Sequence, residues 1–230
     1  MNEIEGFGFV MPHWLYWGWL AVMPLAIMWY MKRKGISEEA ELSPDEQLAL
    51  DILAEEDPAI HDEGNKFTQI LDWMSEKSGV FVAFWTVNAV VFYFYEVVMR
   101  YLFNMPTIWV HEASYLLFGM QYLLAGAYAM LHGAHVRVDI VYVKLPPRGR
   151  VGMDIFTSVF FFIFALAMAG TSWNFFNDSL MMQETTIETW GIQFYPVKAM
   201  MFIGSTLILL AGVSKLIKDI RTFHKMGESA

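Results

Sequence analysis

The chain has 230 residues, of which 56% are apolar and 17% are charged, and its formal net charge is −9 at pH 7. Its charged residues are segregated from long apolar blocks, which excludes an ordinary soluble core and indicates a polytopic membrane protein. The sequence contains no cysteine, so disulfides, thiolate metal sites and cysteine nucleophiles are excluded. It also lacks phosphate-loop, zinc-protease and nucleophile-elbow motifs, and we therefore expect no enzyme activity.

Five apolar blocks each approach the roughly 20 residues that a helix needs to cross about 30 Å of hydrocarbon. They are Phe9–Met31, Val80–Val98, Ala113–Leu131, Ile155–Phe176 and Phe194–Val213. These blocks largely lack the polar stripe of a soluble helix. The sequence therefore predicts an all-α integral membrane protein with an extra amino-terminal transmembrane helix in residues 1–34 and a four-helix core in residues 78–221.

The first block has a signal peptide as its alternative interpretation. Acidic residues, Glu3 and Glu5, precede it where a basic region is expected, and Lys32-Arg33-Lys34 follows it in place of a small-residue cleavage site. We therefore expect a retained helix. Pro24 removes one backbone donor within this helix, so a kink is expected, with the freed carbonyl satisfied by a neighbour.

Residues 35–77 form an insert that holds thirteen acidic residues against Lys66 and Lys77. The cap residue and proline of Ser43-Pro44-Asp45-Glu46 predict a short acidic helix near Asp45–Glu56. A further helical turn in the inner membrane interface is predicted by the spacing of Phe67, Ile70, Leu71 and Met74. We interpret the insert as an acidic cytoplasmic linker, and a docking site for a regulator is the alternative.

The lysines and arginines predict the orientation of the chain. If the first block starts outside, only Arg100 and Lys198 of the fifteen basic residues lie outside. Cytoplasmic connections are enriched in Lys and Arg, so the amino terminus is predicted to be periplasmic and residues 222–230 to form a cytoplasmic tail. Interface anchors are predicted at Trp14, Trp17, Trp19, Trp29, Tyr30, Trp109 and Trp190.

The stretch Arg100–Asp139 carries a specific pattern. Arg100 is followed after eight residues by Trp109 and then by Glu112, and the third block is followed by Gly133-Ala134-His135-Val136-Arg137-Val138-Asp139. This pattern resembles the small membrane (Q) subunit of TRAP transporters, the tripartite ATP-independent periplasmic transporters of bacteria and archaea. The resemblance extends from about Gly79 to about Arg221. The extra helix, Asn104, Pro106-Thr107 and the region of Tyr128 look most like the mannitol or chloroaromatic subgroup.

The resemblance implies a small, non-catalytic permease subunit in the bacterial inner membrane. Its implied partners are a large membrane subunit, a periplasmic substrate-binding protein and the lipid bilayer, but no nucleic acid. The large subunit is expected to hold the sodium and substrate sites for uptake of an organic acid or similar solute. This chain is expected to scaffold that subunit and to bind no cofactor or metal itself.

Polar residues near the ends of the spans are the candidate site residues. Glu96 and Arg100 are four residues apart on one helix and can pair. Trp109 and Glu112 share a helix face, and Glu112 is a further candidate partner of Arg100; the family usually has two adjacent acids where this chain has His111-Glu112. The complete set of candidate partner or structural residues is Glu96, Arg100, Trp109, Glu112, His135, Asp139, Trp190 and Pro196.

His135 and Asp139 lie four residues apart, so a helical turn would let their side chains hydrogen-bond. With His132 nearby, the alternative is a metal or haem site, and the corresponding alternative function is the membrane anchor of a b-type cytochrome. Haem ligands in bundles face one another inside the bundle, whereas the six histidines here lie at span ends or in the insert. The motif is therefore interpreted as structural.

Four residues lie between the last two predicted spans with no basic residue among them: Asp178, Glu184, Glu188 and Trp190. They could contact a periplasmic binding protein through charge complementarity. A solvated loop is the equally supported alternative.

Overall fold

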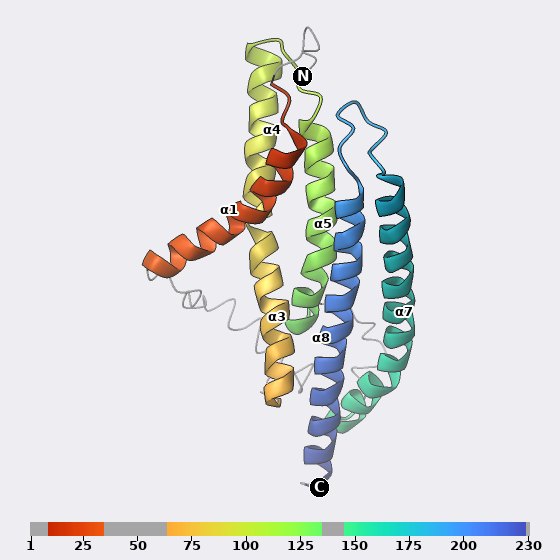
Figure 1. Ribbon diagram of the computed structural model, residues 1–230. Helices are drawn as coiled ribbons and strands as arrows, with labels where there is room; N and C mark the ends of the chain where they lie inside the picture. Colours follow the sequence, from red (N-terminus) through yellow and green to blue (C-terminus); the bar gives the residue numbers. More distant parts are fainter. Residues whose placement is uncertain (1–8, 35–63, 135–144, 229–230) are drawn as a thin grey trace. The chain divides into compact units, whose positions relative to one another are not determined.

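The computed structural model describes residues 9–34, 64–134 and 145–228. Their regular structure is helical: α1 (His13–Lys34), α3 (Lys66–Ala83), α4 (Trp85–Leu102), α5 (Val110–Leu131), α7 (Pro147–Met182) and α8 (Tyr195–Glu228) (Figure 1). Thr185 and Gln193 form an isolated antiparallel bridge. The prediction of an all-α membrane fold is confirmed for this part of the chain. The predicted helix near Asp45–Glu56 lies outside the described residues.

Four of the described helical segments are long and apolar enough to cross a membrane: Lys66–Leu102, Val110–Leu131, Pro147–Met182 and Tyr195–Gly227. They contain the second to fourth predicted spans and all of the fifth except Phe194. Helix α1 has 22 residues, which suffices for the first span, but it is not among the four. Its many tryptophans and tyrosines, whose polar atoms favour the membrane interface, make it less apolar. That α1 crosses the membrane therefore stays a prediction.

Helices α7 and α8 are longer than a bilayer requires. They contain 36 and 34 residues, so each is about 50 Å long at about 1.5 Å per residue. A hydrocarbon core of about 30 Å covers roughly 20 of those residues. Both helices must therefore project beyond the core, and α8 continues as helix to Glu228, through most of the predicted tail.

The second predicted span is divided between two helices. α3 ends at Ala83 and α4 begins at Trp85, with Phe84 between them. Phe84 keeps near-helical angles (φ −67°, ψ −17°), and the Val87 amide donates to the Phe84 carbonyl at 3.2 Å. A donor three residues after its acceptor marks a local tightening of the helix. The interruption is therefore local, and regular helix resumes at Trp85.

The chain divides into two compact units. The first contains Met1–Ile36, Val80–Leu123 and Ser172–Phe202, and the second contains Ser37–Gly79, Leu124–Thr171 and Ile203–Ala230. Each unit combines segments from several of the domains predicted from the sequence. The division into those sequence-based domains therefore stays a prediction.

The two units have different cores. The first is rich in buried aromatic and aliphatic residues, among them Tyr16, Trp85, Phe92, Trp109 and Trp190. In the second, glycines allow close helix packing. A Cβ at Gly79 would overlap the Tyr128 ring, and one at Gly212 would overlap the Phe161 ring. Small residues at these two positions let neighbouring helices approach closely, as in other membrane bundles.

Candidate functional site

Within the first unit, helix α1 contacts α4 near its proline. Pro24 has no backbone N–H, so the Leu20 carbonyl four residues earlier lacks its helical donor. The indole Nε1 of Trp85 on α4 donates to this carbonyl at 2.9 Å. Trp19 adds a second contact by donating to Asn88 Oδ1 at 2.8 Å. The prediction that a neighbour satisfies the carbonyl freed by Pro24 is confirmed.

Glu96 and Arg100 pair on α4, as predicted. The Arg100 guanidinium donates to Glu96 Oε1 in an i, i+4 salt bridge. Glu96 Oε2 accepts from the Thr107 amide at 2.9 Å and from the Thr107 hydroxyl. Glu96 thus fixes the connection between α4 and α5. Among the described residues, the ion pair of Arg100 is with Glu96 and not with Glu112.

Replacing Arg100 with alanine is expected to weaken assembly with a membrane partner more than Lys225→Ala does. The Arg100 side chain is 51% exposed and the Glu96 side chain is 13% exposed. Removing the guanidinium therefore leaves the more buried carboxylate, that of Glu96, without its opposite charge. Exposed ion pairs contribute at most about 1 kcal/mol, and Thr107 still holds Glu96, so we expect a modest effect. The measurement is the recovery and melting temperature of the intact complex. Identical values for the two variants would show that Arg100 is only an exposed interfacial charge.

Trp109 and Trp190 lie together in the first unit, with ring centroids 6.1 Å apart. Their exposed fractions are 2% and 5%, so the prediction that they are interface anchors is wrong. Each indole instead donates to a backbone carbonyl before α1: Trp109 Nε1 to Phe9 O at 2.7 Å and Trp190 Nε1 to Met11 O at 2.9 Å. Burial with a satisfied N–H is the usual arrangement for tryptophan. The two residues therefore hold the segment that leads into α1.

Two side chains of α1 also belong to this aromatic cluster. The His13 ring lies edge-on to Trp190, and its Nε2 is 3.1 Å from the Trp190 carbonyl. The Tyr16 ring also meets Trp190 edge-on at 5.2 Å, and the Tyr16 hydroxyl donates to the Ala113 carbonyl of α5 at 2.7 Å. The start of α1 is thereby attached both to α5 and to the connection before α8.

Glu112 is 2% exposed in the first turn of α5. Its Oε1 accepts from the Thr186 hydroxyl, and its Oε2 has no hydrogen-bond partner among the described residues. The partial positive charge at a helix amino terminus favours an acidic residue at this position. Glu112 therefore links α5 to the connection between α7 and α8, which is a structural contact that spacing alone did not indicate.

Residues 183–194, here called the outer hairpin, connect α7 to α8. The Thr186 amide donates to Ile192 O and the Phe194 amide to Glu184 O, both at 2.8 Å. Lys198 pairs with Glu184, and this hydrogen-bonded ammonium holds the pKa of the Glu184 carboxyl below its usual range. Because Trp190 is buried and Glu184 is paired, a partner approaching the hairpin would meet chiefly its tip, where Ile187 is 101% exposed.

The remaining predicted residues lie elsewhere. His135 and Asp139 are outside the described residues, so their contact stays a prediction. The Nε2 atom of their neighbour His132 lies 2.8 Å from Glu76 Oε2, within the second unit. Pro196 occupies the first turn of α8, where a missing N–H leaves no helical hydrogen bond unmade.

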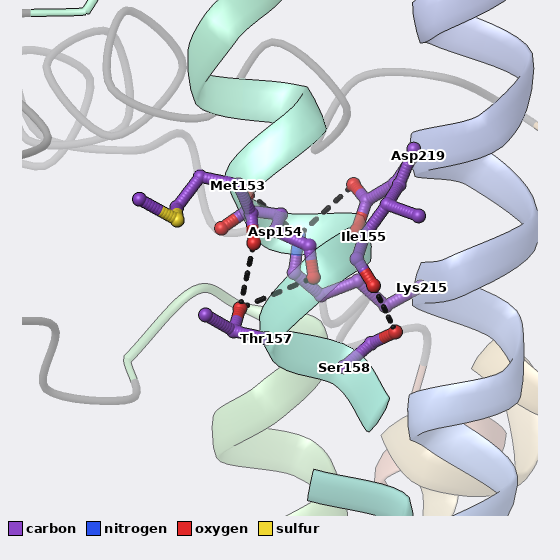
Figure 2. Close-up of polar contacts among 7 residues, drawn as sticks. All are labelled: Met153, Asp154, Ile155, Thr157, Ser158, Lys215 and Asp219. Atoms are coloured by element: carbon purple, nitrogen blue, oxygen red, sulfur yellow. Dashed lines mark hydrogen bonds and ion pairs between the residues drawn. The ribbon is translucent and has the colours of Figure 1, made fainter. Parts of the chain in front are cut away.

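A cluster of ionic residues in the second unit was not predicted. Lys215 Nζ lies 3.1 Å from Asp219 Oδ1 and 3.8 Å from Asp154 Oδ2. Figure 2 shows these three side chains. Asp72 of α3 accepts from Lys218 at 2.7 Å and from Ser214 at 2.6 Å. We call these five charged residues the inner ion cluster. It joins α3, α7 and α8, and the i, i+4 spacing of Lys215 and Asp219 was the available sequence signal.

Some polar side chains within the described spans contact one another or the backbone. Gln121 Nε2 donates to Thr86 Oγ1 at 2.8 Å, and Thr171 donates to the Ala167 carbonyl, also at 2.8 Å. In this part of the chain, no group of three or more His, Cys, Asp or Glu side chains could hold a metal ion. That the protein binds no metal or cofactor stays a prediction.

The sequence was also compared with known proteins. A family model described as "Tripartite ATP-independent periplasmic transporters, DctQ component" matches residues 89–222, more than half of the chain. The match begins within α4 and ends within α8, so α1 lies outside it. No curated protein matches the sequence.

Proposed function

This chain belongs to the DctQ component family of the tripartite ATP-independent periplasmic transporters, and from this membership we propose that it scaffolds the large permease subunit. Membership of this family establishes that the chain is the small membrane subunit of such a transporter and a multi-pass membrane protein. The proposal adds that this subunit is non-catalytic and carries neither solute nor sodium. Those sites belong to the large subunit, which takes up an organic acid or similar solute.

One observation carries the scaffold proposal: Glu96, Glu112 and Lys215 lie near the ends of the apolar blocks and are engaged in structural contacts. Glu96 holds the connection after α4, Glu112 holds the outer hairpin, and Lys215 belongs to the inner ion cluster. Secondary transporters instead bind their substrates near mid-depth, between broken helices. The charges of this chain thus support its own architecture.

Purification of the chain together with its bound partners tests this proposal. A tagged chain purified from its native membranes is expected to bring with it a much larger membrane protein without haem absorbance. Vesicles that contain the chain alone should then show no sodium-driven uptake of the solute recognised by the periplasmic binding protein, while vesicles that also contain the large subunit should show it. Uptake by the chain alone would refute the scaffold proposal, and a Soret band in the purified chain would favour a cytochrome anchor.

We further propose that the protein lies in the inner membrane with a periplasmic amino terminus and a cytoplasmic carboxyl terminus. The split of basic residues supports this orientation. Single cysteines in this cysteine-free chain make it testable with a membrane-impermeant thiol reagent. In intact cells with a permeable outer membrane, Ile187→Cys at the exposed hairpin tip should react, whereas Leu50→Cys should react only after the inner membrane is opened. The reverse pattern of labelling would invert the topology.

A further inference from the structure

Tyr122 is an exposed tyrosine at the centre of an apolar span. It is the tenth of the nineteen residues Ala113–Leu131, and it is 75% exposed. Either end of that block is about 13 Å away at about 1.5 Å per residue. The Phe118 ring stacks beside Tyr122, but within the described part of the chain its hydroxyl has no hydrogen-bond partner. Tyrosines that face lipid favour the membrane interface, where water reaches the hydroxyl, so this position at mid-depth is unusual.

A second exposed polar contact lies next to Tyr122. The Gln121 amide of α5 donates to the Thr86 hydroxyl of α4 at 2.8 Å. This bond uses one of the two amide hydrogens, and no group of the described chain accepts from the other or from the Thr86 hydroxyl. Gln121 and Thr86 both lie well inside their apolar blocks, and both belong to the first unit, as does Tyr122. We call Thr86, Gln121 and Tyr122 the mid-span polar surface.

The exposed threonines of α7 show what lipid alone can cover. Thr157 donates to the Met153 carbonyl at 3.0 Å and Thr171 to the Ala167 carbonyl at 2.8 Å, so both hydroxyls are satisfied within their own helix. The hydroxyls of Thr86 and Tyr122 are not satisfied in this way. Hydrocarbon offers them no acceptor, and an unpaired hydroxyl is costly there. Purely apolar helix faces gain little from leaving lipid, so the mid-span polar surface is the place that calls for a protein partner.

Gly119 makes close approach of a partner possible. It is exposed, it lies one turn before Tyr122 on α5, and a Cβ at this position would meet nothing within 4 Å. Membrane helices approach each other closely at such small residues and form hydrogen bonds between their polar side chains. Broken helices of secondary transporters also carry carbonyls that lack helical donors. A transporter subunit can therefore supply the acceptors that Thr86, Gln121 and Tyr122 lack.

We propose that a transmembrane segment of the large permease subunit docks on the mid-span polar surface and accepts hydrogen bonds from its three side chains. The identity of this partner rests on the proposed function, and the place of contact is new. The Tyr122 hydroxyl contacts the partner directly, so it fixes the depth at which the two subunits meet.

Photo-cross-linking in membranes that contain both subunits tests the place of contact. Tyr122 and, in the control, Phe164 are replaced by p-benzoylphenylalanine. Phe164 is a matched position because it is 66% exposed and is the tenth residue of the predicted span Ile155–Phe176. We expect an adduct with the large subunit at position 122, in a yield several-fold higher than at position 164. Equal yields, an adduct with a second copy of this chain, or an adduct with lipid alone at position 122 would overturn the proposal.

Tyr122→Phe tests the hydrogen bond, because it removes the hydroxyl and keeps the ring. The hydroxyl has no partner in the described chain, so the melting temperature of the chain alone should not change. The Kd for the large subunit, measured by titration in neutral detergent, should rise about threefold, the usual effect of one hydrogen bond between membrane helices. Tyr101→Phe is the control, because Tyr101 is 78% exposed in the last turn of α4, where water can reach its hydroxyl.

Two failures are distinguishable in this titration. If the unmodified chain binds the large subunit and Tyr122→Phe binds as tightly as Tyr101→Phe does, the docking proposal is wrong and the scaffold function stands. If the unmodified chain does not bind the large subunit, the scaffold function fails and the docking proposal fails with it.

Discussion

Replacing Lys215 with methionine is expected to lower the free energy of unfolding by about 3–5 kcal/mol, the usual result of removing one member of a buried ion pair. Lys215 is 24% exposed, and the Asp219 side chain only 3.1 Å away is 2% exposed. Asp154 on α7, 12% exposed, also loses an opposite charge at 3.8 Å. The two carboxylates then lie together without this ammonium, so the packing of α7 on α8 is weakened. The measurement is the melting temperature of the purified subunit.

Two variants separate this effect from a general loss of charge. Lys225→Met removes an exposed lysine near the end of the same helix and should change the melting temperature little. Lys215→Met combined with Asp154→Asn and Asp219→Asn also neutralises the two carboxylates that lost this ammonium and should recover much of the lost stability, because neutral replacements of a whole buried ion pair are often tolerated. A triple variant as unstable as Lys215→Met would show that packing, and not charge, explains the loss.

The second large effect is expected for Trp190→Ala, at about 3–5 kcal/mol, as for other buried tryptophans. Trp190 is 5% exposed and contacts Trp109, Tyr16 and His13. Its loss leaves a cavity and removes the donor to the Met11 carbonyl. We therefore expect both a lower melting temperature and release of the segment before α1. Faster thiol labelling of a cysteine introduced at Met11 would report that release.

Trp190→Phe tests the hydrogen bond separately from the ring. It keeps most of the packing but loses the indole N–H, so the Met11 carbonyl loses its donor at a cost of about 1 kcal/mol. Trp14→Ala is the matched control, because Trp14 is 75% exposed near the start of α1. If Trp14→Ala destabilised the chain as much as Trp190→Ala does, burial of Trp190 would not be the cause.

The buried positions of Trp109 and Trp190 change how the outer residues are interpreted. The sequence pattern placed both on outer connections and suggested contact with the interface or with a binding protein. In the structure, their indole N–H groups donate hydrogen bonds to the chain's own backbone carbonyls at Phe9 and Met11. The outer hairpin can still meet a partner at its tip, where Ile187 is exposed. Trp190 then acts indirectly, by fixing the base of that hairpin.

Local features of the sequence were sufficient to predict the helices and the family. Block length and composition predict the helices, because about 30 Å of hydrocarbon demands roughly 20 apolar residues with internally satisfied backbone groups. The pair of Glu96 and Arg100 also follows from spacing, because residues four apart lie on one helix face. The consequence of Pro24 was predictable for the same reason: the missing N–H of Pro24 leaves the acceptor at a fixed position, the Leu20 carbonyl, without its helical donor.

Only the tertiary structure decided which distant residues meet. Thr186 reaches Glu112 across 74 residues, Trp85 reaches Leu20 across 65, and Ser214 reaches Asp72 across 142. Periodicity assigns a residue to a face of its own helix, but it does not say which helix packs against that face. That choice depends on side-chain shape and on close approaches such as Gly79 to Tyr128. The four described spans were therefore predicted by the sequence alone, whereas the contacts that hold α1, the outer hairpin and the inner ion cluster were decided by packing between helices.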